Sequence, residues 1–123
     1  MLIDTGAGNT CIALDVAEEL QLTMVGLRKG YGAGGIHENK VFEASLRLIA
    51  SNGLVVNSTH QAAGIPDLGK HLDATQVQTG DDYPKRLIGL LGRDFLLHAT
   101  LIYRGSQGII EIQLDMGSFP NQP

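Results

Sequence analysis

The chain has 123 residues and a mass of 13.1 kDa, enough for one domain with a real core and too little for two lobes. Its net charge of −4 and scattered basic residues argue against nucleic-acid binding, and its single cysteine excludes an intrachain disulfide and a thiolate metal site. Neither an apolar run of membrane-spanning length nor a signal segment after Met1 is present, so we expect a cytoplasmic location and no membrane partner.

The composition indicates a mostly β protein. Glycine is abundant at 16 residues, tryptophan is absent and aromatic residues make up 5%. Such a profile favours many turns and short strands over long helices.

The first expected element is a strand over Leu2–Thr5 that ends in a tight turn carrying a carboxylate, Asp4-Thr5-Gly6-Ala7. Gly6 permits a tight turn, and the Thr5 hydroxyl can fix it by hydrogen bonding. A second carboxylate about 3 Å away would share a proton with Asp4, an arrangement that activates water. The alternative for an isolated motif of this kind is a buried Asp that only caps its own turn.

The next segments predict a short helix and two hairpins. Asp15 and Glu18 resemble a capping box for a helix through Leu20. A glycine-dense tip over residues 30–35 separates two extended segments, the second resuming near Glu38. Residues 42–48 alternate between apolar and polar, and the pair at 52–53, Asn-Gly, predicts a tight turn into Leu54–Val56.

The second half of the chain predicts a long connection followed by compact β structure. Residues 61–86 contain Gly, Pro and many polar groups and predict irregular structure. Leu87–Leu91 predicts a buried strand and Gly92–His98 a short helix. Ala99–Tyr103 and Ile109–Leu114 predict a final hairpin.

Two features of the sequence could suggest a cofactor or a metal site, but we expect neither. The glycines over residues 30–35 match a dinucleotide-binding spacing, but Arg28-Lys29 precede them where that motif needs an apolar strand. The four histidines lie in unrelated segments without metal-ligand spacing; we expect at least three of them on the surface, with His98 the candidate for the end of a helix. They are His37, His60, His71 and His98.

Three segments, in this order, resemble the retropepsins, the retroviral-type aspartic proteases. Leu2–Ala7 resembles their catalytic turn, Gly32–Ile36 the tip of their flap, and Ile88–Leu96 their closing motif of apolar residues around Gly-Arg-Asp. The resemblance covers residues 2–56 and 87–114. It implies a closed β-barrel of the retropepsin (acid protease) type with one or two short helices.

The resemblance also implies an activity, partners and site residues. It implies an aspartic endopeptidase, without cofactor, that acts on extended peptides as a homodimer with Asp4 of each protomer at the shared centre. Asp4, Thr5 and Gly6 match the catalytic turn. The positions that match substrate contacts are Leu2, Ala7, Asn9, Gly32, Ala33, Gly34, Gly35, Ile88 and Leu90, with Cys11 a further candidate.

The chain departs from the viral pattern in ways that leave a second function open. Gly8 stands where the viral enzymes carry an acidic partner for the arginine of the closing motif, so Arg93 needs another partner. Only three residues precede Asp4, so we expect a shortened N-terminal strand, one domain over residues 1–116 and a flexible tail over 117–123. The alternative to the protease is a catalytically inactive retropepsin-like module for dimerisation or peptide binding.

Overall fold

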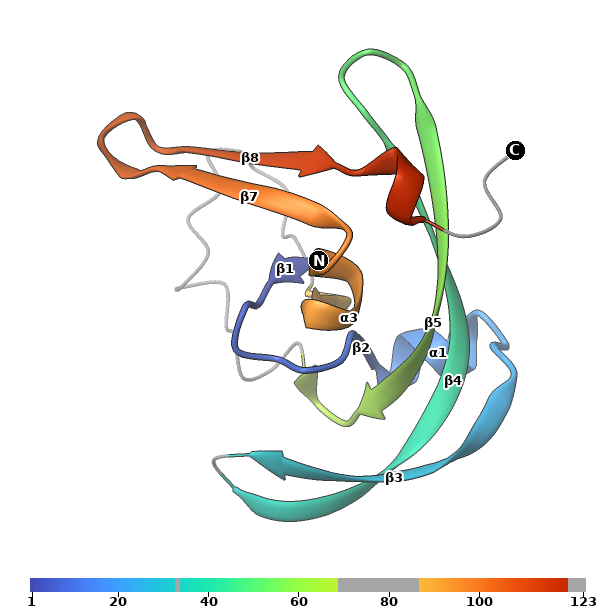
Figure 1. Ribbon diagram of the computed structural model, residues 1–123. Helices are drawn as coiled ribbons and strands as arrows, with labels where there is room; N and C mark the ends of the chain where they lie inside the picture. Colours follow the sequence, from blue (N-terminus) through green and yellow to red (C-terminus); the bar gives the residue numbers. More distant parts are fainter. Residues whose placement is uncertain (33, 69–86, 120–123) are drawn as a thin grey trace, which may run out of the picture.

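The computed structural model describes residues 1–32, 34–68 and 87–119. The described chain is mostly β, with a six-stranded mixed sheet, a separate two-stranded hairpin and two short α-helices (Figure 1). The predicted fold class is confirmed at this level. The strand order β1-β6-β2-β5-β4-β3 leaves two sheet edges, so the described residues do not form the closed barrel expected from the resemblance.

The elements have the following bounds. The large sheet contains β1 (Leu2–Ile3), β2 (Cys11–Ala13), β3 (Met24–Gly32), β4 (Gly35–Ile49), β5 (Val55–Ile65) and β6 (Gly89–Leu91). The hairpin consists of β7 (Ala99–Arg104) and β8 (Ile109–Leu114), joined by the 3₁₀ turn η1 (Gly105–Gln107). The helices are α1 (Leu14–Glu19), α3 (Arg93–Leu96) and the 3₁₀ turn η2 (Met116–Ser118).

The long β4–β5 ribbon forms where the sequence alternates and turns. Phe42 and Ala44 are buried on its inner face, and the ribbon turns at Asn52-Gly53, as predicted. The Asn52 side chain accepts a hydrogen bond from the Leu54 N–H at 3.1 Å, and Gly53 takes a φ of +85°. The Asn-Gly signal therefore fixes the pairing of β4 with β5.

Strand β5 is longer than the sequence predicted. We expected the strand to end at Val56 and an irregular connection to begin at Gln61, but β5 continues to Ile65. Its last residues are paired on both sides, because Ala63 lies opposite Val41 of β4 and Cys11 of β2. The irregular-connection prediction is wrong for Gln61–Ile65, and its remainder from residue 69 lies outside the described residues.

The two helices also differ from the sequence prediction at their ends. We expected Asp15 to cap α1, but the N-cap is Ala13 and Asp15 lies in the first turn, where it accepts from the Val16 N–H. Helix α3 is limited to Arg93–Leu96 because Gly92 and Leu97 form its caps. Both helices remain single short elements, as expected.

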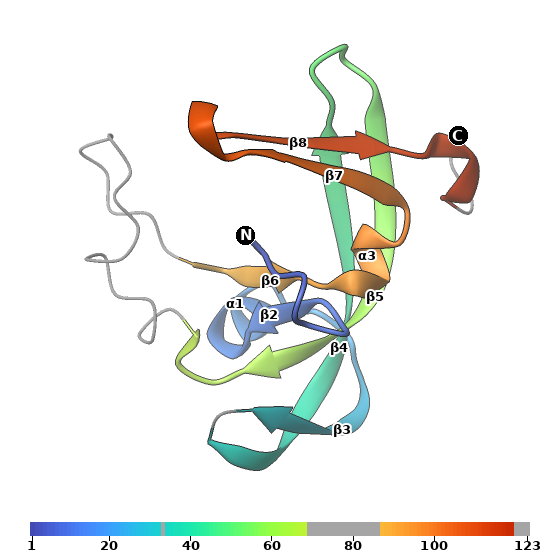
Figure 2. The same ribbon diagram turned by 60° about the vertical axis from the view of Figure 1, so that its left-hand side comes forward.

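The sheet topology brings the start of the chain beside strand β6. Strand β6 lies between β1 and β2, with Leu90 opposite Leu2 on one side and Cys11 on the other. The loop of residues 4–10 is therefore placed directly beside the start of α3. Figures 1 and 2 show this loop between the β7–β8 hairpin on one side and the β3–β4 hairpin on the other.

The core connects α3 to the end of the chain. Val56, Leu91, Phe95 and Phe119 form one buried cluster, and the Phe95 and Phe119 rings lie 5.8 Å apart. Phe119 is 6% exposed. Packing therefore extends at least to Phe119, past the domain boundary that we placed after Met116.

Candidate active site

The Asp4 carboxylate lies on a turn that leaves the sheet directly after β1. The Asp4 N–H donates to the Leu91 carbonyl at 2.9 Å, which continues the β1–β6 pairing, and the Ala7 N–H closes the turn on the Asp4 carbonyl at 3.2 Å. The Gly6 N–H donates to Asp4 Oδ1 at 2.9 Å. This hydrogen bond holds the half-buried carboxylate on the turn and leaves Oδ2 available for chemistry.

Arg93 holds the same turn from α3. Its Nη1 donates to the carbonyls of Thr5 at 3.1 Å and Gly6 at 3.4 Å, and its backbone N–H donates to the Ala7 carbonyl at 2.8 Å. Main-chain carbonyls therefore take the place of the acidic partner that the viral enzymes carry at the position of Gly8. A guanidinium suits this task because its donors are arranged in a rigid fork.

Asp94 fixes the far end of the loop of residues 4–10, which we call the candidate active-site loop. Its Oδ1 accepts from the Thr10 N–H at 2.9 Å, the Thr10 hydroxyl at 2.7 Å and the Phe95 N–H at 2.8 Å. The Gly92 N–H donates to Thr10 Oγ1 at 3.2 Å. A Cβ on Gly92 would lie 2.4 Å from the Asn9 carbonyl carbon, so this close approach requires glycine.

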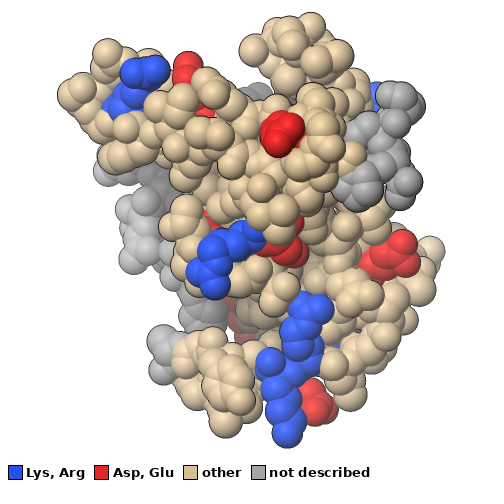
Figure 3. All heavy atoms as spheres, viewed as in Figure 1, with Lys and Arg blue, Asp and Glu red and all other residues tan. Residues whose placement is uncertain are grey.

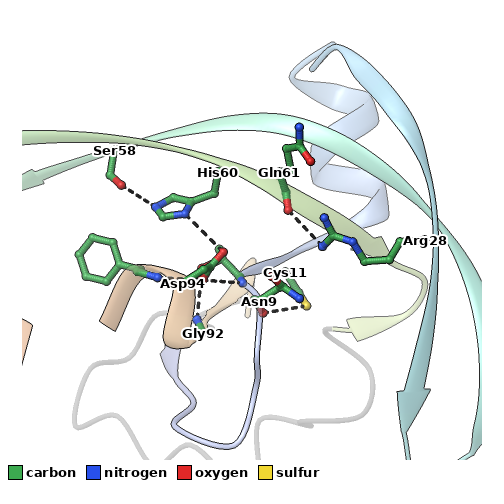
Figure 4. A network of polar contacts seen from close by, with 10 residues as sticks. Asn9, Cys11, Arg28, Ser58, His60, Gln61, Gly92 and Asp94 are labelled. Atoms are coloured by element: carbon green, nitrogen blue, oxygen red, sulfur yellow. Dashed lines mark hydrogen bonds and ion pairs between the residues drawn. The ribbon is translucent and has the colours of Figure 1, made fainter. Parts of the chain in front are cut away.

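The network extends from Asp94 into β5 (Figure 4). His60 Nδ1 lies 3.3 Å from Asp94 Oδ2, and His60 Nε2 lies 2.5 Å from the Ser58 hydroxyl. His60 is 9% exposed, so its expected surface position is wrong. The alternation Val56, Ser58, His60 along β5 places His60 on the same face as the buried Val56. The sequence prediction missed this because it ended the strand at Val56.

A groove of about 750 Å³ lies between the active-site loop and the β3–β4 hairpin. The site candidates that line it are Gly6, Ala7, Asn9, Cys11 and Gly32. The described candidates that do not line it are Asp4, Thr5, Leu2, Gly34, Gly35, Ile88 and Leu90, and Ala33 lies outside the described residues. Sequence reasoning did not include its other lining residues, which are Gly8, Arg28, Lys29, Gly30, Tyr31, His37, Glu38, Asn39, Ala63, Ile65 and Pro66.

The apolar candidates are placed on the neighbouring strands. Leu2 lies opposite Leu90 in the β1–β6 pair, and the Ile88 carbonyl accepts from the Ala13 N–H at 2.8 Å. Leu2 and Ile88 are each more than 40% exposed. These side chains lie in and beside the sheet around the turn, and the groove begins at Gly6.

Cys11 lies in the groove as a neutral thiol. Burial raises the pKa of the Cys11 thiol, the carboxylate of Asp94 adds to the rise, the guanidinium of Arg28 opposes it, and Asp4 contributes a smaller increase. A thiol with a raised pKa is a poor nucleophile at neutral pH. Cys11 is therefore a wall of the groove.

The glycine tip of the β3–β4 hairpin contains one residue with a positive φ: Gly35 has a φ of +102°. If the chain has the peptidase activity that the resemblance implies, replacing Gly35 with Val should lower kcat/KM by about tenfold or more, because a β-branched residue resists positive φ at a cost of about 1–3 kcal/mol. Peptide cleavage measured with initial rates tests this.

Gly26, in strand β3 and outside the groove lining, supplies the matched control. It has no positive φ, and a Cβ added there meets no atom within 4 Å. Gly26→Val should therefore retain kcat/KM within about twofold. Equal losses in the two variants would show that the backbone conformation of Gly35 is not what matters.

No family model, curated protein or solved structure matches the chain. Among the described residues, no helix is long and apolar enough to cross a membrane. Likewise, no three His, Cys, Asp or Glu side chains of the described ranges come together as a metal ion would require. The functional assignment therefore depends on the sequence motifs and on the geometry of the turn and groove.

Proposed function

We propose that this protein is an aspartic endopeptidase with a retropepsin-type fold, in which Asp4 of two protomers activates water. The observation that carries the proposal is the Asp4 carboxylate, which is held by the Gly6 N–H on a turn that ends at a peptide-sized groove. Arg93 and Asp94, both from the third motif, stabilise that turn and its loop. The first and third motifs thus meet at one place in the molecule.

A second carboxylate is required, and within residues 1–32, 34–68 and 87–119 the structure places no free one beside Asp4. Asp94 is the acidic residue bonded into the loop, but its Oδ1 already accepts three hydrogen bonds and its Oδ2 faces His60. Asp4 of a second copy is the simplest source, because a twofold axis beside the turn places equivalent groups together.

The chemistry follows from a shared proton. Two carboxylates about 3 Å apart cannot both ionise readily, so the pair holds one proton at acidic to mildly acidic pH. The ionised carboxylate accepts a proton from water as the water oxygen attacks the peptide carbonyl carbon, and the protonated one donates to the carbonyl oxygen. Collapse of the tetrahedral intermediate with protonation of the nitrogen then breaks the C–N bond.

Exposed apolar side chains around the turn support a partner surface. On the β7–β8 hairpin, Tyr103 is 72% and Ile110 54% exposed, and they lie opposite each other. At the β3–β4 tip, Tyr31 is 83% and Ile36 65% exposed, and these also form a cross-strand pair. Such surface is costly in water and gains free energy when a second protomer covers it.

Activity should depend on protein concentration. On dilution below the dimer dissociation constant, cleavage per protomer should fall, because each protomer alone has one Asp4. Sedimentation at several concentrations, beside cleavage of a peptide library at pH 4–7 with and without a statine-type transition-state mimic, measures both properties. A strictly monomeric protein with undiminished activity per chain would contradict the shared pair.

Two substitutions separate assembly from general surface effects. Ile110→Lys should weaken the dimer and lower activity at low concentration, whereas Leu20→Lys should change neither. Leu20 is the matched control because it is 62% exposed and lies at the end of α1, away from the turn. A stable dimer that cleaves no peptide would indicate the alternative, an inactive dimerisation or peptide-binding module.

A further inference from the structure

Arg28 projects into the groove from the middle of β3. Its neighbours along the strand, Leu27 and Lys29, are exposed, whereas Arg28 is half-buried, as expected for a residue on the inner face of an alternating strand. Figure 4 shows its guanidinium directed toward β5, near Cys11. Its Nη1 donates to the Gln61 carbonyl at a long 3.4 Å.

The Arg28 charge has no acidic partner in the part of the chain that the structure describes. Two other basic side chains do approach a carboxylate, since Lys40 lies 4.0 Å from Glu18 and Arg104 lies 4.0 Å from Glu111. Within residues 1–32, 34–68 and 87–119, the only hydrogen bond of the Arg28 side chain is the one to Gln61. A guanidinium has five N–H donors, so most of them remain available to a ligand.

The groups around Arg28 are mostly uncharged, so few of them would compete with a ligand carboxylate for its guanidinium. Asn9 and Cys11 form the opposite wall of the groove, and Asn39 lies across the strand pair from Arg28. These groups are uncharged. The acidic residue in the lining, Glu38, lies opposite Lys29 in the register. Figure 3 shows basic side chains gathered on the lower part of this face, over β3 and β4, although the whole chain carries a net charge of −4.

We propose that Arg28 is a specificity-determining residue and that the groove binds extended peptides carrying an acidic side chain, Asp or Glu, beside it. This inference rests on the proposed function only in taking a peptide as the occupant. A carboxylate in this position would accept a bidentate, charge-assisted hydrogen bond from the guanidinium. The rest of the bound chain would lie along the main chain of β3 and the loop of residues 6–9.

The test uses two sets of eight-residue peptides. In one set a single Glu is moved through every position of an otherwise uncharged sequence, and in the other Gln replaces that Glu. The wild-type protein should cleave the Glu peptide about tenfold faster at one position, and Arg28→Gln should cleave the Glu and Gln peptides at equal rates. The preference should also shrink in high salt.

Lys40→Gln is the matched control, because it removes the same charge from the next strand at a residue that does not line the groove. It should retain the full preference for Glu. Cleavage by the wild-type protein without any Glu–Gln difference, or a preference that Arg28→Gln leaves intact, would overturn the inference and leave the proposed function standing.

A binding measurement separates the two proposals. The Asp4→Asn protein should bind the preferred Glu peptide about tenfold more tightly than its Gln partner by calorimetry, and Arg28→Gln in that background should equalise them. If the wild-type protein cleaves neither peptide but this difference in affinity is found, the inference holds and the protease proposal fails. If the two peptides bind Asp4→Asn equally, the inference is wrong.

Discussion

Replacing Asp4 with Asn should abolish peptide cleavage, with a fall in kcat of about a thousandfold or more. The amide fills the same space and its oxygen still accepts from the Gly6 N–H, a hydrogen bond of 2.9 Å in the wild-type protein. It cannot accept a proton from water or share one with a second carboxylate. In the wild-type protein, cleavage should be fastest at acidic pH, where the pair holds one proton.

Asp115→Asn supplies a matched control within the same chain. The Asp115 carboxylate accepts from the Gly117 N–H at 3.1 Å, the same local hydrogen bond that Asp4 makes with Gly6. The two substitutions therefore disturb equivalent turns, but Asp115 lies far along the chain at η2. Asp115→Asn should leave activity within about twofold of wild type.

The outcome that contradicts the assignment is residual cleavage. Asp4→Asn protein with a tenth of the wild-type rate would require a different reactive group. If cleavage is lost, thermal unfolding and sedimentation of the variant show whether the cause is the missing carboxylate or a loss of fold or dimer. We expect both the fold and the dimer to be preserved.

Sequence reasoning succeeded where the signal was local. The Asn52-Gly53 turn, the alternation over residues 42–48 and the final hairpin each depend on neighbouring residues, and all are present in the structure. The active-site turn was also local, because Asp4 and Gly6 are two residues apart. Short-range patterns of this kind are set by turn chemistry and strand period.

The sequence-based predictions failed where the residue that stabilises an element is distant in the chain. Thr10 bonds to Asp94, 84 residues away, and no spacing rule connects them. His60 was expected on the surface because its burial depends on β5 continuing to Ile65 between β4 and β2. Arg28 gives no local signal of its role, because its place in the groove depends on strand β3 lying across from the loop of residues 6–9.

Replacing Asp94 with Ala should destabilise the fold by about 2–4 kcal/mol, the second large effect that we expect. The substitution leaves the Thr10 N–H, the Thr10 hydroxyl and the Phe95 N–H without their shared acceptor. It also leaves the buried His60 without its carboxylate. Urea unfolding followed by circular dichroism measures the loss.

Asp94→Asn is the informative companion, because its amide oxygen can accept the same three hydrogen bonds and its NH₂ can donate to neutral His60 Nδ1. We expect a loss of about 1 kcal/mol or less. A double-mutant cycle with Thr10→Val should give a coupling of about 1 kcal/mol with Asp94→Ala, since the hydroxyl donates to that carboxylate at 2.7 Å. If Asn and Ala destabilise equally, the carboxylate charge rather than its acceptor geometry supports the loop. If the cycle gives no coupling, the link between Thr10 and Asp94 does not hold the active-site loop in place, and another contact must do so.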